Sequence, residues 1–221
     1  MDGKNPDMNN VNYHQTRFQF DKKRQIVWST LVDCYFQNFS GNDSTVLEVG
    51  AGYCDFINNI KAQKKYAFDI WEGIRGYANK DVETIVGSAE ELNKIPDGSV
   101  NLIFASNVFE HLTQAQLAEM LKYLHQKLER NGNLVIVQPN FKYAFKEYFD
   151  DYTHCSIWTD VSLADFLHAH NWDVEYVAPK FMPLSLKSRL PTWPFLIKLY
   201  LLLPFKPMGK QMLLVARKNK T

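Results

Sequence analysis

The stretch that decides the fold is Thr45–Phe56, with the sequence TVLEVGAGYCDF. Its short, β-branched apolar run contains one acid, Glu48, and leads into Gly50 and Gly52. A helical segment is expected to follow over Phe56–Ala62. Strand, glycine turn and helix together form a loop in which the backbone approaches a nucleotide closely, because no Cβ obstructs it at the glycines. The stretch therefore predicts a nucleotide-binding turn after a first strand.

Further signals follow this turn in order along the chain. Asp69 ends the run Lys65–Asp69, nineteen residues after Gly50. An acid at the tip of a second parallel strand can accept hydrogen bonds from ribose hydroxyls. The segment Gly87–Leu92 reads GSAEEL, and Asn107–Leu112, which reads NVFEHL, follows a later apolar run.

The order of these segments resembles the class I S-adenosylmethionine-dependent methyltransferases, especially the broad small-molecule, type 11-like branch with E-x-G-x-G, G-x-A-E-x-L and E-H-L segments. The resemblance extends from about Val46 to Asn140. It implies S-adenosyl-L-methionine as cofactor. It also implies an α/β fold with a doubly wound, seven-stranded Rossmann-like sheet, in which strand seven is antiparallel and lies between strands five and six. One departure is Cys54, where the family often has a third glycine.

The resemblance also implies roles for individual residues. Asp69 is expected to bind the ribose, and Glu48 either orders the turn or meets the cofactor's ammonium group through water. Many relatives have an acid at the Ser88 position, so Glu90 is an alternative partner for the adenine amino group. The candidate cofactor-binding residues are Glu48, Gly50, Ala51, Gly52, Asp69, Ser88, Ala89, Glu90 and Asn107.

Length and composition favour one domain over residues 1–221. Residues 1–15 are expected to form a flexible tail, residues 16–40 a leading helix, and residues 179–209 an apolar and basic insertion between strands six and seven. In the leading segment, core packing is the simpler interpretation, with cover over the cofactor as the alternative. The candidates for that cover are Tyr13, Arg17 and Phe18.

Alternating strand and helix patterns predict the remaining elements. A capping box at Thr113 and Gln116 begins the clearest helix, which is expected to end at Arg130, before Asn131-Gly132. Asp21 and Thr159 are two further expected helix starts. The expected strands are Thr45–Val49, Lys65–Asp69, Val82–Val86, Val100–Ala105, Asn133–Gln138, Trp172–Val177 and Gln211–Ala216, and a short helix is expected over Trp71–Asn79.

The cysteines and the N-terminus indicate a cellular compartment. Cys34, Cys54 and Cys155 are odd in number and widely spaced, which fits neither a zinc motif nor a disulfide framework. The segment Met1–Asn10 is polar and has no apolar signal core. We therefore expect a cytoplasmic protein.

The chemistry of methyl transfer limits which catalytic residues are needed. Methyl transfer is a direct displacement, so alignment in a dehydrated site supplies most of the rate enhancement. A hydroxyl acceptor also benefits from a general base, and a neutral histidine suits that role near pH 7. His154 and Asp151, in the loop after the fifth strand, are candidates, and so is His111, after the fourth; structural roles are the alternative. Asp150-Asp151 is a weak basis for a metal site, so no metal is expected.

The predicted function is transfer of a methyl group from S-adenosylmethionine to a small-molecule or glycan-type acceptor, with a hydroxyl as the methylated group. One alternative is a non-catalytic module that keeps the fold and docks a membrane or protein partner. A nicotinamide-dependent oxidoreductase is disfavoured, because its fingerprint needs glycine where this chain has Asp55. Nucleic acid is not expected as substrate, because Asn107 is not followed by the Pro-Pro-Tyr/Phe sequence of many amino-methylating relatives. A protein acceptor stays open.

Basic residues are concentrated in the C-terminal part of the chain. The whole chain has a net charge of +1, but residues 176–221 carry nine Lys or Arg and no Asp or Glu. Such asymmetry can mark an anionic partner. Within it, residues 181–208 combine apolar bulk with cationic side chains, which suits an interfacial helix on an anionic membrane. A lid over the acceptor and a homodimer contact are the alternatives.

Overall fold

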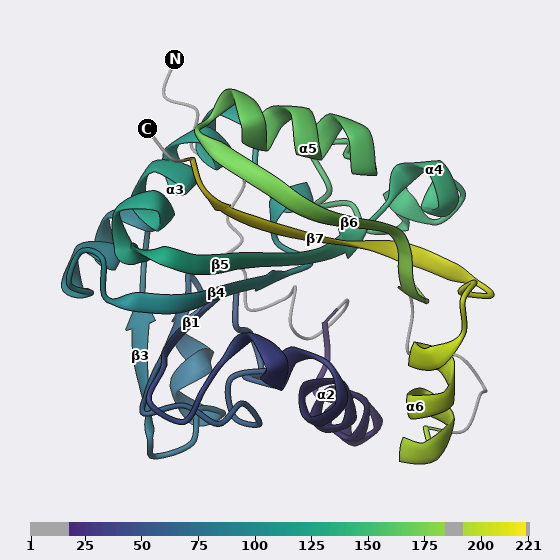
Figure 1. Cartoon of the computed structure of the whole chain (residues 1–221), viewed down its shortest axis with the longest axis horizontal. Coiled ribbons are helices and arrows are strands. Elements are labelled where there is room, and N and C mark those ends of the chain that lie inside the picture. Colours follow the sequence, from purple (N-terminus) through teal and green to yellow (C-terminus); the bar gives the residue numbers. More distant parts are fainter. Residues whose placement is uncertain (1–17, 184–191, 220–221) are drawn as a thin grey trace.

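A computed structural model describes residues 18–183 and 192–219 of the chain. They form one seven-stranded sheet, in the order β3-β2-β1-β4-β5-β7-β6, with helices on both faces (Figure 1). β7 (Gly209–Lys218) runs antiparallel between β5 (Leu128–Pro139) and β6 (Trp172–Pro183). The predicted fold class is confirmed, including the antiparallel seventh strand.

The parallel strands bring the loops of interest to one edge. β1 (Thr45–Val49) pairs in parallel with β2 (Lys64–Asp69) and β4 (Val100–Ser106). β3 (Val82–Val86) extends the sheet beyond β2, and β5 extends it beyond β4. The strand order reverses between β1 and β4, and ligands bind at the carboxyl edge near such a reversal.

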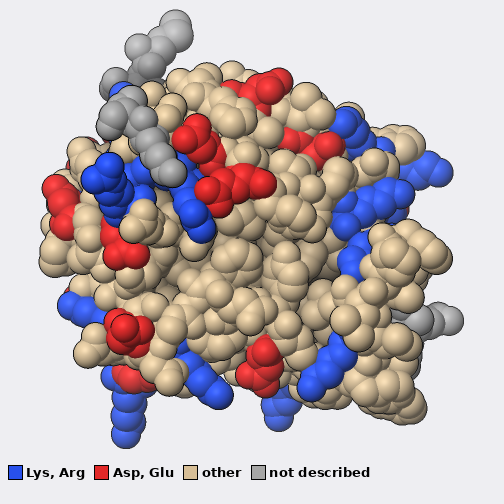
Figure 2. Space-filling view, in the orientation of Figure 1, with Lys and Arg blue, Asp and Glu red and all other residues tan. Residues whose placement is uncertain are grey.

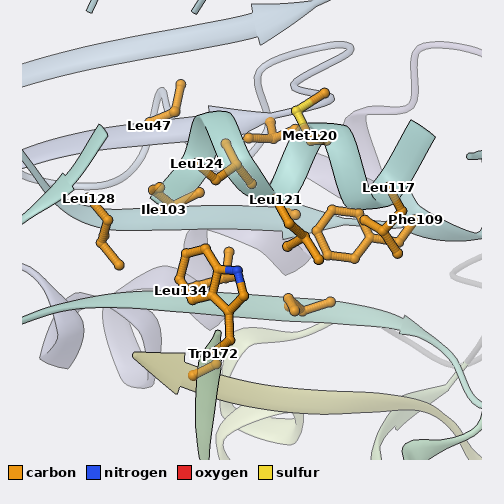
Figure 3. Packing of buried hydrophobic residues seen from close by; sticks show 14 of the residues in the cluster. Leu47, Ile103, Phe109, Leu117, Met120, Leu121, Leu124, Leu128, Leu134 and Trp172 are labelled. Carbon is orange, nitrogen blue, oxygen red and sulfur yellow. The ribbon is translucent and has the colours of Figure 1, made fainter. Parts of the chain in front are cut away.

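Two layers of helices enclose two hydrophobic cores. The first core lies under α3 and α5 and includes Leu121, Leu124 and Trp172 (Figure 3). The second lies under α2 and includes Trp28 and Phe104, with α6 packed at its margin. The helices are α2 (Lys22–Cys34), α3 (Gln114–Lys127), α4 (Phe141–Ala144), α5 (Asp160–Ala169) and α6 (Pro194–Leu202), and the 3₁₀ turns are η1 (Phe36–Phe39), η2 (Glu72–Gly76), η3 (Ala89–Lys94), η4 (Phe109–His111) and η5 (Tyr148–Asp150).

The predicted helix starts are confirmed. The Asp21 side chain accepts a hydrogen bond from the amide of Lys23 (2.8 Å) at the start of α2. Thr113 and Gln116 form the expected capping box of α3, and a second box begins at Thr159. Each cap satisfies backbone amides that the first turn of a helix leaves without a partner.

The helix expected over Phe56–Ala62 is wrong. Residues 52–59 form consecutive turns, in which the amides of Asn58 and Ile60 donate four residues back, whereas that of Asn59 donates only three back, to the carbonyl of Phe56 (3.0 Å). Two constraints fall inside this segment. Glu48 of β1 accepts a hydrogen bond from the amide of Ile57, and Cys54 has a positive φ of 59°. The left-handed conformation of Cys54 interrupts regular helical geometry before Phe56, and the bond to Glu48 holds the segment against β1.

Two helix boundaries also differ from the predictions. α2 begins at Lys22 instead of residue 16, and residues 18–20 are not helical. α3 ends at Lys127, because Leu128 is already extended and pairs with Val100 of β4. Asn131-Gly132 therefore lies within β5 instead of ending the helix. The expected tail, residues 1–15, lies outside the described residues.

Two segments near the sheet edges differ in extent. The helix expected over Trp71–Asn79 is reduced to the 3₁₀ turn η2. β6 continues to Pro183, so the first residues of the expected insertion at 179–209 belong to the sheet. In the described part of the chain, none of the helices has the length and apolar character needed to cross a bilayer.

Candidate cofactor and acceptor site

The glycine turn leaves β1 in a conformation that favours glycine. Gly50 and Gly52 have φ values of 67° and 49°, a region that residues with a Cβ rarely adopt. The amides of Gly50 and Ala51 both donate to the carbonyl of Phe68 in β2, at 2.8 and 3.1 Å. A Cβ on Gly50 would collide with Val108, which follows β4. The turn is thus held against β2 and against the loop after β4.

Asp69 connects the end of β2 to this turn. Its Oδ2 accepts a hydrogen bond from the amide of Gly52 and its Oδ1 accepts one from the amide of Trp71, both at 2.8 Å. Burial raises the pKa of Asp69, and the backbone hydrogen bonds oppose that rise. A carboxylate has about four acceptor positions, so the two backbone bonds leave capacity for ribose hydroxyls. The geometry fits the predicted ribose contact.

Glu48 points into the protein. Its carboxylate is buried, and Oε2 accepts the amide of Ile57 at 3.0 Å. Burial raises the pKa of Glu48 well above its usual value, against the lowering effect of that hydrogen bond, and the nearby Asp55 and Asp69 raise it further. Of the two predicted roles, the structure supports ordering of the turn.

The residues expected near adenine follow β3 at the same edge. The amide of Gly87 donates to the carbonyl of Asp69 (3.0 Å), which places the end of β3 beside the end of β2. Ser88 is the N-cap of η3, and Ser88 and Glu90 are exposed, whereas Ala89 is half-buried. These residues therefore lie at the carboxyl edge, directly after β3.

Asn107 follows β4 and has a positive φ of 53°. Its amide donates to the carbonyl of Val137 in β5 (2.8 Å), and its Oδ1 accepts a hydrogen bond from Nε2 of Gln211 in β7 (2.9 Å). Asn107 therefore fixes the loop between β4 and η4 to two further strands. The side chain lies at the carboxyl edge of the sheet, and its contact with the cofactor stays a prediction.

Aromatic residues around the glycine turn were not predicted as site residues, apart from Phe18. A Cβ on Gly52 would come within 2.8 Å of Cε1 of Phe18, so this ring lies directly on the turn. Phe18 packs against Tyr53, and Tyr53 packs against Trp71, with ring centroids 5.2 and 5.3 Å apart. The guanidinium of Arg24 lies 4.3 Å from the centre of the Phe18 ring. Tyr13 and Arg17, the other proposed covering residues, lie outside the described residues.

Arg24 also anchors the leading helix to the turn. Its side chain forms a buried ion pair with Asp55 and donates to the carbonyl of Gln19 at 3.0 Å. Asp55 thus has a partner on α2, which explains an acid at the position where a dinucleotide fingerprint has glycine. The density of aromatic residues near the turn is the signal in the sequence that could have revealed this packing.

The three candidate catalytic residues meet in space. Nδ1 of His111 lies 2.8 Å from Oγ1 of Thr153, which donates to Oδ1 of Asp151 at 2.6 Å. The rings of His111 and His154 are 4.8 Å apart between centroids. Thr153 has a single hydroxyl proton, and it is directed to Asp151, so Nδ1 of His111 carries a proton and donates to Thr153. Nε2 is then the lone-pair nitrogen of His111.

Ionisation fits this arrangement. Burial, together with the neighbouring His154, lowers the pKa of His111 to about 4, so the ring is neutral near pH 7. Burial acts to raise the pKa of Asp151, but the hydrogen bonds from Thr153, with smaller electrostatic contributions from His111 and His154, outweigh it, and the net direction is downward. An ionised Asp151 and a neutral His111 follow. Asp150, by contrast, is exposed.

Glu110 was missed by the sequence reasoning. Its side chain is 0% exposed, and neither carboxylate oxygen has a hydrogen-bond partner among the described residues. Burial raises the pKa of Glu110 to about 8, and Asp151 contributes to the rise. One ligating atom from each of Glu110, His111 and His154 lies within 4.8 Å of the others.

Comparison with known proteins identifies the family. The model of a family described as a methyltransferase domain matches residues 20–177, more than half of the chain. This chain belongs to that methyltransferase family. It is an S-adenosylmethionine-dependent methyltransferase, as the resemblance implied. No curated protein sequence matches it.

Solved structures share the fold of this methyltransferase. An S-adenosylmethionine-dependent methyltransferase from Archaeoglobus fulgidus has a TM-score of 0.66 and 20% identity, covering 96% of this chain and 100% of that one. A chain from the complex of the Haloferax volcanii Trm112 activator with a methyltransferase has a TM-score of 0.64 and 13% identity, covering 88% and 90%. Geranyl diphosphate C-methyltransferase from Streptomyces coelicolor, with Mg²⁺, its substrate and S-adenosyl-L-homocysteine, has a TM-score of 0.59 and 13% identity, covering 85% and 78%. At these identities the likeness shows the fold alone.

Proposed function

We propose that this methyltransferase transfers the methyl group to a hydroxyl oxygen of a small-molecule or saccharide acceptor. The observation that carries the proposal is the chain Asp151–Thr153–His111, with His154 beside it. Val108, three residues before His111, packs against Gly50 of the cofactor turn. The loop that carries His111 therefore touches the glycine turn, which supports a methyl transfer between ligands held at the two places.

The residues divide the work as follows. The turn from Gly50 to Gly52 and the carboxylate of Asp69 would hold S-adenosylmethionine, which supplies an activated methyl group when bound. The acceptor hydroxyl loses its proton as its oxygen bonds to the methyl carbon, and a neutral imidazole, of His154 or His111, takes that proton. Asp151 is a positioning residue, which acts on His111 through Thr153.

Substitution of the cluster tests the proposal. We expect His154→Ala to lower turnover by about 10²–10⁴-fold, the usual contribution of a general base. Its affinity for S-adenosylhomocysteine should stay unchanged, because His154 belongs to the loop after η5, whereas the glycine turn follows β1. His168→Ala, at an exposed histidine on α5, is the matched control.

The acceptor is sought with isotopically labelled methyl donor against pools of sugars, lipid-linked sugars and phenols. Mass spectrometry should locate the label on oxygen. A label on nitrogen or carbon would contradict the hydroxyl assignment. Binding of S-adenosylhomocysteine without any product from any pool would favour the non-catalytic alternative.

We further propose peripheral contact with an anionic membrane through residues 193–208. Large apolar side chains are exposed there, and Leu202 is 81% exposed. Figure 2 shows uncharged surface over the region of α6, with Lys and Arg residues beside it. Lys198 is exposed at this surface, whereas Lys206 donates to the carbonyls of Tyr200, Leu201 and Leu203 and so caps α6. The exposed apolar residues are Trp193, Phe195, Leu199, Leu202, Phe205 and Met208.

Flotation with vesicles tests this contact. The wild type should float with anionic vesicles, and Leu202→Asp should not, because the apolar face supplies the insertion energy. Val161→Asp, at an exposed apolar position of α5, is the control. A homodimer through the same surface is the competing outcome; wild type that stays with the unbound protein but sediments as a dimer would establish it.

A further inference from the structure

Three potential metal ligands converge at the acceptor cluster from two loops. Glu110 and His111 belong to η4, after β4, and His154 belongs to the loop that follows η5. Their ligating atoms lie within 4.8 Å of one another. Donor atoms around a tetrahedral zinc ion with bonds of about 2.1 Å lie about 3.4 Å apart. Small side-chain rotations would therefore bring the three donors onto one ion.

Glu110 is the observation that points to a cation. A carboxyl group that is 0% exposed, with both oxygens lacking hydrogen-bond partners among the described residues, costs several kcal/mol to bury. Buried carboxylates are ordinarily paired with a cation or bound to a metal. Among the described residues, no Lys or Arg forms an ion pair with Glu110 in this structure. The imidazoles of His111 and His154 are the groups that could bind a cation together with Glu110.

The surroundings of His111 fit a ligand. A metal-binding histidine usually donates its second ring N–H to a polar oxygen, which fixes the tautomer and the ring orientation. Nδ1 of His111 donates to Thr153, and Thr153 in turn donates to Asp151. That arrangement leaves Nε2 as the ligating nitrogen. The backbone of the second loop is also tied to the first, because the amides of Cys155 and Ser156 donate to the carbonyl of Glu110 at 3.0 and 3.1 Å.

We propose that Glu110, His111 and His154 bind one divalent transition-metal ion. Two imidazoles and one carboxylate favour Zn²⁺, Co²⁺, Fe²⁺ or Ni²⁺ over Mg²⁺ and Ca²⁺, which prefer all-oxygen sites. Three protein ligands leave coordination positions for other molecules, the arrangement of catalytic rather than structural sites. This proposal departs from the expectation of no metal, which considered only Asp150-Asp151.

The ion would deepen the proposed function, on which its catalytic role rests. An acceptor hydroxyl bound to the ion has a lowered pKa, and its proton passes to solvent. The resulting alkoxide forms the oxygen–carbon bond while the carbon–sulfur bond breaks and its electron pair stays on sulfur. In the metal-bound protein the two imidazoles serve as ligands, and the ion takes over the activation of the hydroxyl. Neighbouring hydroxyls of a saccharide would suit the open positions.

Metal binding is tested on the untagged full-length chain after removal of metals with a chelator. Titration with Co²⁺, followed by calorimetry and visible absorption, should show one saturable equivalent. We expect Glu110→Gln and His154→Ala to weaken binding by at least ten-fold. We expect Thr153→Val to weaken it about 10–100-fold, the usual cost of losing an outer-shell partner. Asp150→Asn and His168→Ala, both at exposed positions, should bind as the wild type does.

The wild-type titration decides the proposal even where a variant fails to fold. A wild type that takes up no single saturable equivalent of Co²⁺ or Zn²⁺ overturns it. Folded Glu110→Gln and His154→Ala proteins that bind like the wild type overturn it equally. Binding of S-adenosylhomocysteine to the metal-free protein shows whether the cofactor site forms without the ion, and so tests the two proposals separately. Oxygen methylation without metal binding would remove the ion and keep the proposed function, whereas metal binding with label on nitrogen or carbon would do the reverse.

Discussion

Asp69 provides the sharpest test of the cofactor site. Its carboxylate accepts two backbone hydrogen bonds, from Gly52 and from Trp71, each at 2.8 Å. Asp69→Asn preserves the shape but offers only one oxygen, so the new amide group faces one of the two backbone N–H groups. The substitution therefore loosens the glycine turn and removes the charged acceptor for ribose.

The expected loss of affinity follows from these contacts. A hydrogen bond to a charged group contributes about 1.5–3 kcal/mol. Each 1.4 kcal/mol is a factor of ten in Kd, so Asp69→Asn should weaken S-adenosylhomocysteine binding roughly ten- to a hundred-fold. Asp165→Asn, at an exposed acid of α5, should leave the affinity unchanged.

Asp69→Asn can weaken binding by loosening the glycine turn or by removing the ribose acceptor. Calorimetry with analogues of S-adenosylhomocysteine that lack the 2′- or 3′-hydroxyl distinguishes these two effects. The wild type should bind the deoxy analogues less tightly, and Asp69→Asn should discriminate far less between them and the parent compound. Equal affinity of the wild type for all three compounds would refute the assignment of Asp69 to ribose.

Other substitutions test the fold around the site. Overpacking typically costs about 1–3 kcal/mol. Gly50→Ala should lower the free energy of unfolding, measured by urea denaturation, by more than that, because its Cβ collides with Val108 and the backbone also has a positive φ. Thr113→Ala should cost about 1 kcal/mol in the same assay, through loss of the α3 cap. Burial acts to raise the pKa of Asp160, but hydrogen bonds from Lys142 and Asn140 outweigh it and lower the pKa. Its stabilising effect is therefore present above the pKa of the unfolded chain and lost as pH falls through the folded one, and Asp160→Asn should flatten the acid side of the stability profile.

Local signals in the sequence determined the first two strands, the turn between them and the helix starts. The β-branched run before Gly50 and the acid at position 69 located the first two strands and the turn between them. Ser, Thr and Asp caps depend on residues only a few positions apart, and those at Asp21, Thr113 and Thr159 were found correctly. The order of the sheet, with its antiparallel last strand, followed from the resemblance rather than from any periodicity.

Tertiary contacts decided the rest. The segment after Cys54 has helical spacing, but Cys54 has a positive φ of 59° and a carboxylate from β1 binds the amide of Ile57, and local propensity encodes neither feature. The helix at Thr113 ended early because Leu128 gained a strand partner in Val100. In the same way, Glu110 reads in the sequence as part of an E-H-L segment. Only the folded chain shows that its carboxyl group is buried beside His111 and His154, with no hydrogen-bond partner in the part of the chain that the structure describes. Patterns of a few residues reveal caps and turns because the interacting groups are close in the chain, whereas the pairing of distant loops is set by how the sheet brings them to one edge.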